Sequence, residues 1–185
     1  EFNRVTDIYP SEPGLLQSLL PFLTKLPRSL LPGRLKFIKD FSDTSKPVGA
    51  AFNNPSLISQ DGMEANTKQW RNAEIPAANG HGTARSIAKL YGILANGGSR
   101  DGIHVLTPET IEMSRLPQSE GKDLVLGGMN TKFGLGFMLG NENISMGPNN
   151  KSFGHGGAGG SLGFCDPDNH VSLGFVMNQM HPGIT

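Results

Sequence analysis

The sequence predicts an α+β fold in which an antiparallel sheet is flanked by helices. Two observations support this prediction. Apolar residues recur with helical spacing between residues 84 and 116. From about residue 130 onward, short runs of apolar residues and glycine are bounded by turn residues, which is typical of strands. One face of such a sheet and one stripe of each helix would share a single apolar core.

The clearest helix is predicted over residues 84–95. Thr83 can cap it, because the side-chain oxygen can accept a hydrogen bond from an N–H of the first turn. Gly97 and Gly98 end it, since glycine adopts the left-handed conformation that a helix end often needs. Its apolar stripe, repeated every 3.6 residues, comprises Ala84, Ile87, Ala88, Tyr91, Leu94 and Ala95.

A second helix is predicted over residues 107–116. Thr107 supplies a cap, Pro108 occupies the first helical position, and Glu109 places an acid in the first turn. Residues 81–116 are therefore assigned to helices.

Residues 1–60 form a proline-rich segment in which we expect one short amphipathic helix. We expect its apolar face to pack on the rest of the domain; the alternative is a helix that binds a membrane surface or a partner. Residues 32–80 are rich in Asn, Ser, Pro and Gly, and we expect an irregular surface excursion there, with a loop over residues 61–80. The leucines that define the helix are Leu15, Leu16, Leu19, Leu20 and Leu23.

Residues 130–180 are assigned to strands. Phe133–Leu139 alternates glycine with large apolar residues, which suits a strand with one closely approached face. Ser152–Cys165 and Val171–Asn178 are predicted to pair as an antiparallel hairpin across the turn Asp166–Asn169.

Composition excludes several classes of protein. The 16 basic and 16 acidic residues cancel, and no basic stripe is present, so we expect no nucleic-acid partner. No apolar run is long enough to span a membrane. The single cysteine, Cys165, cannot form an internal disulfide. The chain begins at Glu1 without an initiator Met or a signal peptide, so residues 1–185 are predicted to be one partial domain from a fragment or a processed piece.

The glycine-rich stretch Lys151–Cys165 is the main candidate for a functional site. Glycines inside a strand often mark a bulge or a place where a ligand approaches the backbone. Residues His155–Ala158 can pair with an acyl group along their main chain and direct a backbone N–H at a developing oxyanion. His155 adds a donor or a switchable charge. The alternative is a glycine-rich bulge with a structural histidine, and composition favours neither.

The same stretch also spells the dinucleotide fingerprint Gly154-x-Gly156-x-x-Gly159. That motif requires a helix N-terminus behind it to hold the pyrophosphate. Ser161–Phe164 predicts a strand there, so we interpret the match as false; a helix directly after Gly160 would favour nucleotide binding. No Gly-Lys-Ser/Thr triplet is present, and the five histidines include no close ligand pair, so no metal site is expected.

Ser86 and Lys89 have the Ser-x-x-Lys spacing of serine acyl-enzymes, in which the lysine takes the proton of a serine at a helix N-terminus. Here the pair lies inside the helix that begins near Thr83. We therefore interpret both residues as part of a solvated polar face. Tyr9–Ser11 has the form of the Tyr-x-Asn/Ser element of those enzymes, but it lies in a proline-rich opening segment without supporting context.

Several ordered motifs resemble those of the β-lactamase-related serine hydrolases. That family includes class C β-lactamases, DD-peptidases, family VIII esterases and LACTB-like proteins. The likeness is good over residues 70–180. The segments that carry it are Asn79–Gly98 (the Gly-Thr-Ala-Arg helix), Leu106–Ile111 (the next helix), Phe133–Phe137 (the following strand), Phe153–Ser161 (the third motif, written Lys-Thr-Gly or His-x-Gly), Asp166–Asp168 and Val176–Asn178.

The resemblance implies an incomplete β-lactamase/transpeptidase-like fold and acyl transfer to water through a serine ester, without a cofactor. His155, Gly156 and Gly157 match the third motif, which holds a small acyl substrate. The backbone N–H of Ala158 matches the donor that completes the oxyanion hole. The family's Ser-x-x-Lys and Tyr-x-Asn motifs would precede this chain, so we expect it to be inactive alone.

The family's C-terminal helix would follow Thr185, so we also expect an exposed apolar sheet surface that favours self-association or a protein partner. The alternative function is accordingly that of a non-catalytic paralogue, acting as a structural or partner-binding module. For a catalytic member, His155 in place of a lysine favours esters or peptides over β-lactam carboxylates, because a neutral imidazole attracts a carboxylate less than an ammonium does.

Overall fold

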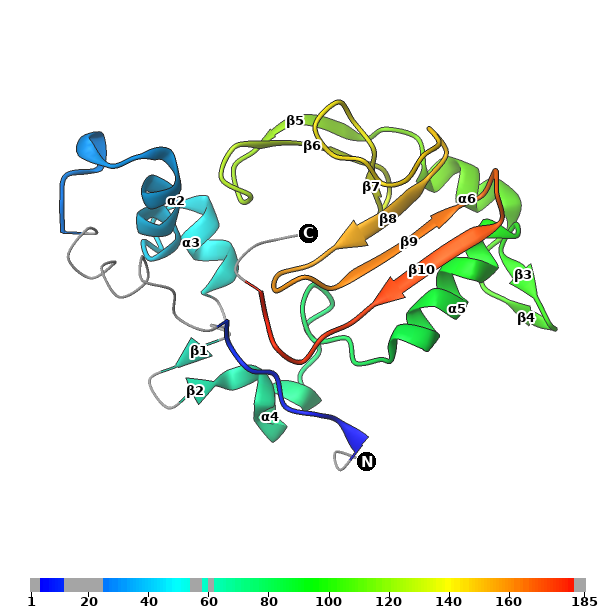
Figure 1. Cartoon of the computed structure of the whole chain (residues 1–185), viewed down its shortest axis with the longest axis horizontal. Helices are drawn as coiled ribbons and strands as arrows, with labels where there is room; N and C mark the ends of the chain where they lie inside the picture. The colour runs from blue at the N-terminus through cyan, green and yellow to red at the C-terminus, as the bar shows by residue number, and fades with distance from the viewer. Residues whose placement is uncertain (1–3, 12–24, 54–57, 60–61, 182–185) are drawn as a thin grey trace.

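The computed structural model describes residues 4–11, 25–53, 58–59 and 62–181. Its main feature is a six-stranded antiparallel sheet in which strands that follow one another in sequence are neighbours, in the order β10-β9-β8-β7-β6-β5 (Figure 1). The predicted α+β class is confirmed. The strands are β5 (Ser119–Asp123), β6 (Met129–Phe133), β7 (Met138–Leu139), β8 (Phe153–Gly156), β9 (Leu162–Asp166) and β10 (Val171–Phe175).

Helices and two small hairpins surround this sheet. The helical segments are η2 (Arg28–Leu30), α2 (Gly33–Phe41), α3 (Pro47–Phe52), η3 (Glu64–Asn66), α4 (Lys68–Asn72), α5 (Ala84–Ala95) and α6 (Pro108–Ser114). The small hairpins pair β1 (Ile58–Ser59) with β2 (Gly62–Met63), and β3 (Ser99–Arg100) with β4 (Ile103–His104). No helix in the described part of the chain is both long and apolar enough to cross a bilayer.

Both helices predicted from capping residues are confirmed. At the start of α5, the Thr83 hydroxyl oxygen accepts a hydrogen bond from the backbone N–H of Ser86 (3.1 Å), and Ser86 Oγ accepts one from the N–H of Thr83 (2.9 Å). At its end, the N–H of Gly98 (φ +87°) bonds to the carbonyl of Ile93 (2.8 Å). In α6, Thr107 caps the N–H of Thr110 (3.2 Å).

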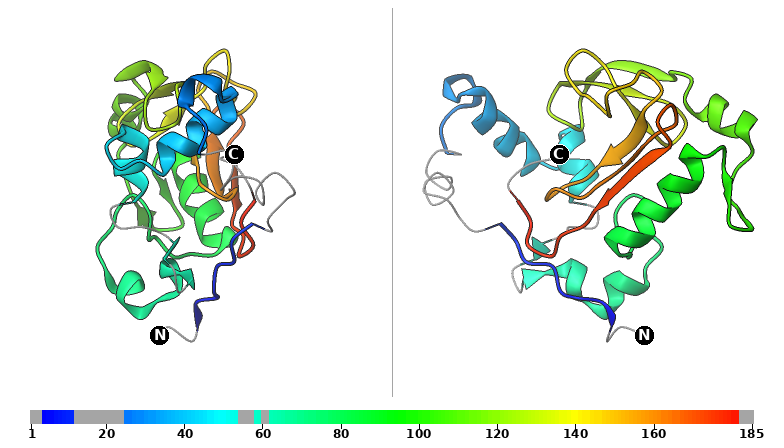
Figure 2. Two further views of the ribbon diagram at one scale, coloured as in Figure 1. Left: turned by 90° about the vertical axis from the view of Figure 1, so that its left-hand side faces the viewer. Right: turned by 45° about the vertical axis from the view of Figure 1, so that its right-hand side comes forward.

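The core lies between the sheet and the α5–α6 pair. Helix α5 runs along one face of β9 and β10, as Figures 1 and 2 show, and Ser172 Oγ donates a hydrogen bond to the Ala88 carbonyl (2.8 Å). The apolar stripe of α5 is wider than predicted at its C-terminal end, where Gly92 and Ile93 are also buried. The central cluster comprises Leu94, Ala95, Ile111, Leu139, Phe153 and Cys165.

The expectation of an irregular stretch over residues 32–80 is wrong at the helices α2, α3, η3 and α4 and at the β1–β2 hairpin. Of these elements, β2, η3 and α4 lie in the expected loop 61–80. These helices are short, and side chains that hydrogen-bond to the backbone hold them. Thr67 caps α4 at the N–H of Trp70 (3.1 Å). Asn53 Nδ2 donates to the carbonyls of Phe41 (2.8 Å) and Gly49 (2.9 Å), which ties α2 to α3. The helix expected around Leu15–Leu23 lies outside the described residues.

Phe133–Leu139 is not one strand, contrary to prediction. The chain leaves β6 at Phe133 and re-enters the sheet in β7, and the N–H of Gly134 bonds to the carbonyl of Phe137 (2.9 Å). A Cβ on Gly134 would lie 2.0 Å from the carbonyl oxygen of Ser114, so the alternating glycines serve a turn that packs against the end of α6. Strand β5 also begins earlier than the range assigned to strands.

Ser152–Cys165 is likewise two strands, β8 and β9, which pair with each other. The predicted hairpin across Asp166–Asn169 is confirmed as β9 and β10, with Val171 opposite Asp166 and Phe175 opposite Leu162. The sheet face away from α5 carries apolar side chains of β10. Val171 is 51% exposed, Leu173 41% and Phe175 48%, so this face is only partly covered by the described residues.

Candidate active site

The glycine-rich stretch forms a tight reversal between β8 and β9, which we call the glycine turn (residues 157–161). The N–H of Gly157 bonds to the carbonyl of Ser161 (2.8 Å), and the N–H of Gly160 bonds to the carbonyl of Gly157 (3.1 Å). Gly159 and Gly160 have φ values of +83° and +110°, which side chains disfavour. Ala158, the predicted oxyanion donor, is exposed in this turn.

His155 is the second-last residue of β8, one residue removed from the glycine turn, and its side chain is exposed. Its register partner is Gly163 on β9, and paired residues point to the same face of a sheet. A Cβ on Gly163 would lie 2.4 Å from Cε2 of Tyr91, a residue of α5. The imidazole of His155 therefore emerges on the α5 face, with its ring centroid 5.8 Å from that of Phe133.

One contact indicates which nitrogen of the His155 ring carries the proton. Nδ1 of His155 lies 2.5 Å from the carbonyl oxygen of Gly156. A carbonyl oxygen only accepts hydrogen bonds, so Nδ1 carries the proton and Nε2 is the acceptor in the neutral ring. His155, Gly156, Gly157 and Ala158 thus lie on one reversal, in which His155 and Ala158 are exposed and Gly156 is buried. Beneath it, burial raises the pKa of the Tyr91 phenol to about 12, so this ring stays neutral.

The structure supports the rejection of two motifs, the dinucleotide fingerprint and the Ser-x-x-Lys pair. Strand β9, not a helix, follows Gly160, which contradicts the dinucleotide reading. Ser86 Oγ donates to the carbonyl of Thr83 (2.8 Å) and accepts from the N–H of Thr83 (2.9 Å), so this hydroxyl serves as a helix cap. Lys89 is exposed. Within the described ranges, no three His, Cys, Asp or Glu side chains are close enough to hold a metal ion.

The glycine turn is also held by a part of the chain that the sequence did not point to. The N–H of His181 bonds to the carbonyl of Gly159 (2.9 Å). A Cβ on Gly159 would lie 2.7 Å from Cε of Met177 and 2.9 Å from Cε of Met180. No local sequence pattern predicts these contacts, because they join segments that are distant along the chain.

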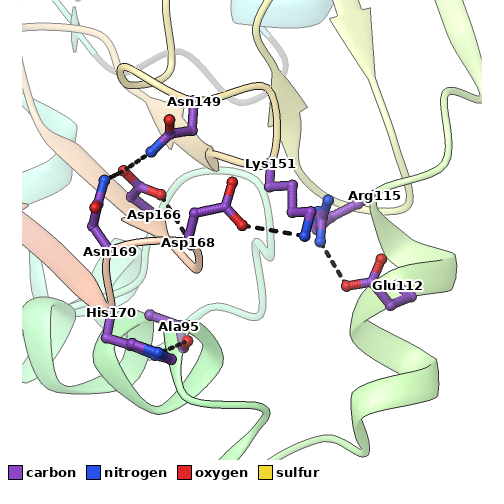
Figure 3. A network of polar contacts seen from close by, with 9 residues as sticks. All are labelled: Ala95, Glu112, Arg115, Asn149, Lys151, Asp166, Asp168, Asn169 and His170. Atoms are coloured by element: carbon purple, nitrogen blue, oxygen red, sulfur yellow. Dashed lines mark hydrogen bonds and ion pairs between the residues drawn. The ribbon is translucent and has the colours of Figure 1, made fainter.

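The opposite end of β9 carries a polar network around Asp166, a residue only 2% exposed (Figure 3). Its carboxylate accepts hydrogen bonds from Nδ2 of Asn149 (2.6 Å), Nδ2 of Asn169 (2.8 Å) and the N–H of Asp168 (3.1 Å). Burial raises the pKa of Asp166, but the hydrogen bonds from Asn169 and Asn149 outweigh burial, so this pKa lies below its ordinary value. The network fixes the β9–β10 turn, and with it the strand that faces His155.

A hollow of about 250 Å³ lies on the β5–β6 hairpin. Phe133 lines it, and the same ring contacts His155. The remaining lining residues are Ser119, Glu120, Gly121, Lys122, Asp123 and Thr131. The hollow therefore shares one aromatic ring with the surroundings of His155, and both apolar and polar groups line it.

Cys165 is expected not to react with a thiol reagent in the native protein. The side chain is 0% exposed, and burial raises the pKa of its thiol to about 12, so almost no thiolate exists at pH 8. Ellman's reagent should release no colour from the folded chain and one equivalent per chain in 8 M urea. Rapid labelling of the folded chain, at the rate seen in urea, would contradict the described packing around β9.

Residues 39–184 match the family model described as Beta-lactamase. The esterase/β-lactamase LipL of Mycobacterium tuberculosis is 41% identical over 108 residues, which are 58% of this chain and 24% of LipL.

Three solved structures are also similar to this chain. A family VIII carboxylesterase has a TM-score of 0.65 at 38% identity, over 74% of this chain and 36% of that one. A penicillin-binding protein homologue from Caulobacter crescentus has a TM-score of 0.61 at 41% identity, over 72% and 34%. EstA from Arthrobacter nitroguajacolicus Rue61a has a TM-score of 0.63 at 30% identity, over 76% and 37%. The chain thus spans about a quarter of LipL and about a third of each structure. From its motifs, its sheet and these matches, the chain belongs to the β-lactamase family, with the serine hydrolases and esterases as its relatives.

Proposed function

We propose that this chain is the substrate-binding C-terminal portion of a serine hydrolase that cleaves an ester, an amide or a β-lactam through an acyl-serine intermediate. The observation that carries the proposal is the reversal at His155–Ser161. It presents an exposed imidazole on the α5 face, followed by a run of glycine backbone, in a chain of this family. The relatives named as esterases favour an ester substrate.

In this mechanism, the main chain of His155–Gly157 binds the acyl group and the N–H of Ala158 donates to the oxyanion. A preorganised N–H of this kind is a large catalytic contribution. Nε2 of His155, free to accept a hydrogen bond from substrate in the neutral ring, orients the bound molecule. The attacking serine and its lysine and tyrosine partners are assigned to a preceding part of the protein, because Ser86 already caps α5.

The test uses this chain and a longer protein that joins it to a segment with Ser-x-x-Lys and Tyr-x-Asn motifs. We expect a fluorophosphonate probe to label the longer protein and not the chain alone. Hydrolysis of p-nitrophenyl butyrate and of nitrocefin by the chain alone should equal the buffer rate. Activity of the chain alone that disappears in Ser86→Ala would refute this assignment, and Lys89→Ala tests the second residue of the same motif.

A second candidate is a non-catalytic module that binds a partner or itself. The observation that favours it is the half-exposed apolar face formed by Val171, Leu173 and Phe175 on β10. The probe experiment distinguishes the two functions. A longer protein that folds but is not labelled by the probe would favour the binding module.

A further inference from the structure

The N-terminal segment of the described chain reaches the residues that follow β10. Figures 1 and 2 show this segment, in dark blue, crossing the red chain beyond β10. The N–H of Tyr9 bonds to the carbonyl of Asn178 (2.7 Å), and the N–H of Met180 bonds to the carbonyl of Tyr9 (2.9 Å). Tyr9 and Gln179 therefore form an isolated parallel bridge between the two ends of the chain.

The residues after β10 in turn hold the glycine turn. The N–H of His181 bonds to the carbonyl of Gly159, and the side chains of Met177 and Met180 pack against Gly159. Glycines bring no side chains of their own to fix a turn, and they lose the most conformational freedom on ordering. The position of this turn thus depends on contacts from elsewhere in the fold.

Asn66 anchors the other side of the N-terminal segment. Its Oδ1 accepts a hydrogen bond from the N–H of Ile8 (2.8 Å), and its Nδ2 donates one to the carbonyl of Ile8 (2.8 Å). The amide thus pairs with Ile8 as a neighbouring strand would. An ion pair between Arg71 and Asp7 (2.7 Å) lies next to it.

We infer that Asn66 is a positioning residue: through Ile8–Tyr9 and the residues 178–181 it fixes the glycine turn that carries Ala158. This inference rests on the proposed function for the role of Ala158, and on the contacts above for the positioning itself. Its physical reason is that an oxyanion donor contributes to catalysis only when it is already in place before the reaction.

The first test measures amide hydrogen exchange by NMR in Asn66→Ala. Losing two hydrogen bonds of ordinary strength should speed exchange at Tyr9, Met180 and His181 by about tenfold or more. The amide resonance of Ala158 should move, whereas exchange at Phe153 and Cys165 should stay unchanged and show that the core is intact. The matched control is Asn53→Ala, which also removes an amide with two hydrogen bonds to the backbone, in this case two donated to carbonyls of α2 and α3.

The second test uses Asn66→Asp, which should be rescued by acid. At neutral pH the carboxylate accepts from the N–H of Ile8 but repels its carbonyl, so the Ala158 resonance should be displaced as in Asn66→Ala. Below about pH 4 the protonated acid can again donate to that carbonyl. The resonance should then return to its position in the wild-type chain at the same pH.

Unchanged exchange at His181 and an unmoved Ala158 resonance in Asn66→Ala would overturn the inference, as would an equal effect of Asn53→Ala. In the longer active protein, Asn66→Ala should lower kcat more than it raises KM; an unaltered kcat would overturn the catalytic consequence. If the exchange result holds while the longer protein takes up no probe, the positioning stands and the proposed function fails.

Discussion

Replacing Phe153 by alanine is expected to lower the free energy of unfolding by about 3–5 kcal/mol. Phe153 is 0% exposed and lies in the central cluster, with its ring edge-on to Phe137 at 4.8 Å between centroids. The guanidinium of Arg115 lies 5.8 Å from the same ring. Removing the ring leaves a cavity that the sheet on one side and α5–α6 on the other cannot close. Urea unfolding followed by fluorescence of the buried Trp70 measures the loss.

The control for this prediction is Leu124→Ala. Leu124 is 69% exposed, so its truncation should change the free energy of unfolding by less than about 0.5 kcal/mol. If Phe153→Ala does not fold, Phe153→Leu is measured instead. Its free energy of unfolding should fall by about 1–2 kcal/mol. Equal losses in Phe153→Leu and Leu124→Ala would contradict the placement of this ring in the core.

Adding one methyl group at Gly163 is expected to cost about 1–3 kcal/mol. The new Cβ would lie 2.4 Å from Cε2 of Tyr91 and 2.8 Å from Cγ2 of Ile87, so α5 must move away from β9. Because Gly163 is the register partner of His155, the NMR signals of the imidazole should shift as well. Thermal unfolding of Gly163→Ala and a two-dimensional spectrum of its histidines measure both effects.

Gly80→Ala is the matched control, because a Cβ at Gly80 meets no atom within 4 Å. A double-mutant cycle locates the cause of the loss. In a Tyr91→Leu background, Gly163→Ala should cost less than it does alone, since the ring that it strikes is gone. Strictly additive losses, or an equal loss in Gly80→Ala, would refute close packing of α5 on β9 as the reason for this glycine.

The elements that the sequence predicted well are those that local chemistry encodes. Thr83 and Thr107 cap the helices that follow them, and the turn after Asp166 joins two paired strands. In each case the groups that make the structure lie within a few residues of one another. A periodic pattern together with a cap or a turn residue is then sufficient evidence.

The prediction failed where distant contacts decide the conformation. Phe133–Leu139 has the pattern of a strand, but it turns because Gly134 packs on the carbonyl of Ser114. The stretch around Gly159 also reads as strand, yet it reverses because β8 and β9 must pair. Asn66 gives no functional signal at all in the sequence, since its partner, Ile8, is 58 residues away.

By itself, the sequence determined the α+β class, the helices α5 and α6, the β9–β10 hairpin and the family. It also predicted that His155–Ala158 bind an acyl group, and this stays a prediction. Only the tertiary structure decided that this stretch reverses between β8 and β9, exposes His155 and Ala158, and is held by the residues that follow β10. The physical reason is that glycine permits many backbone conformations, so the choice among them comes from the atoms packed around it.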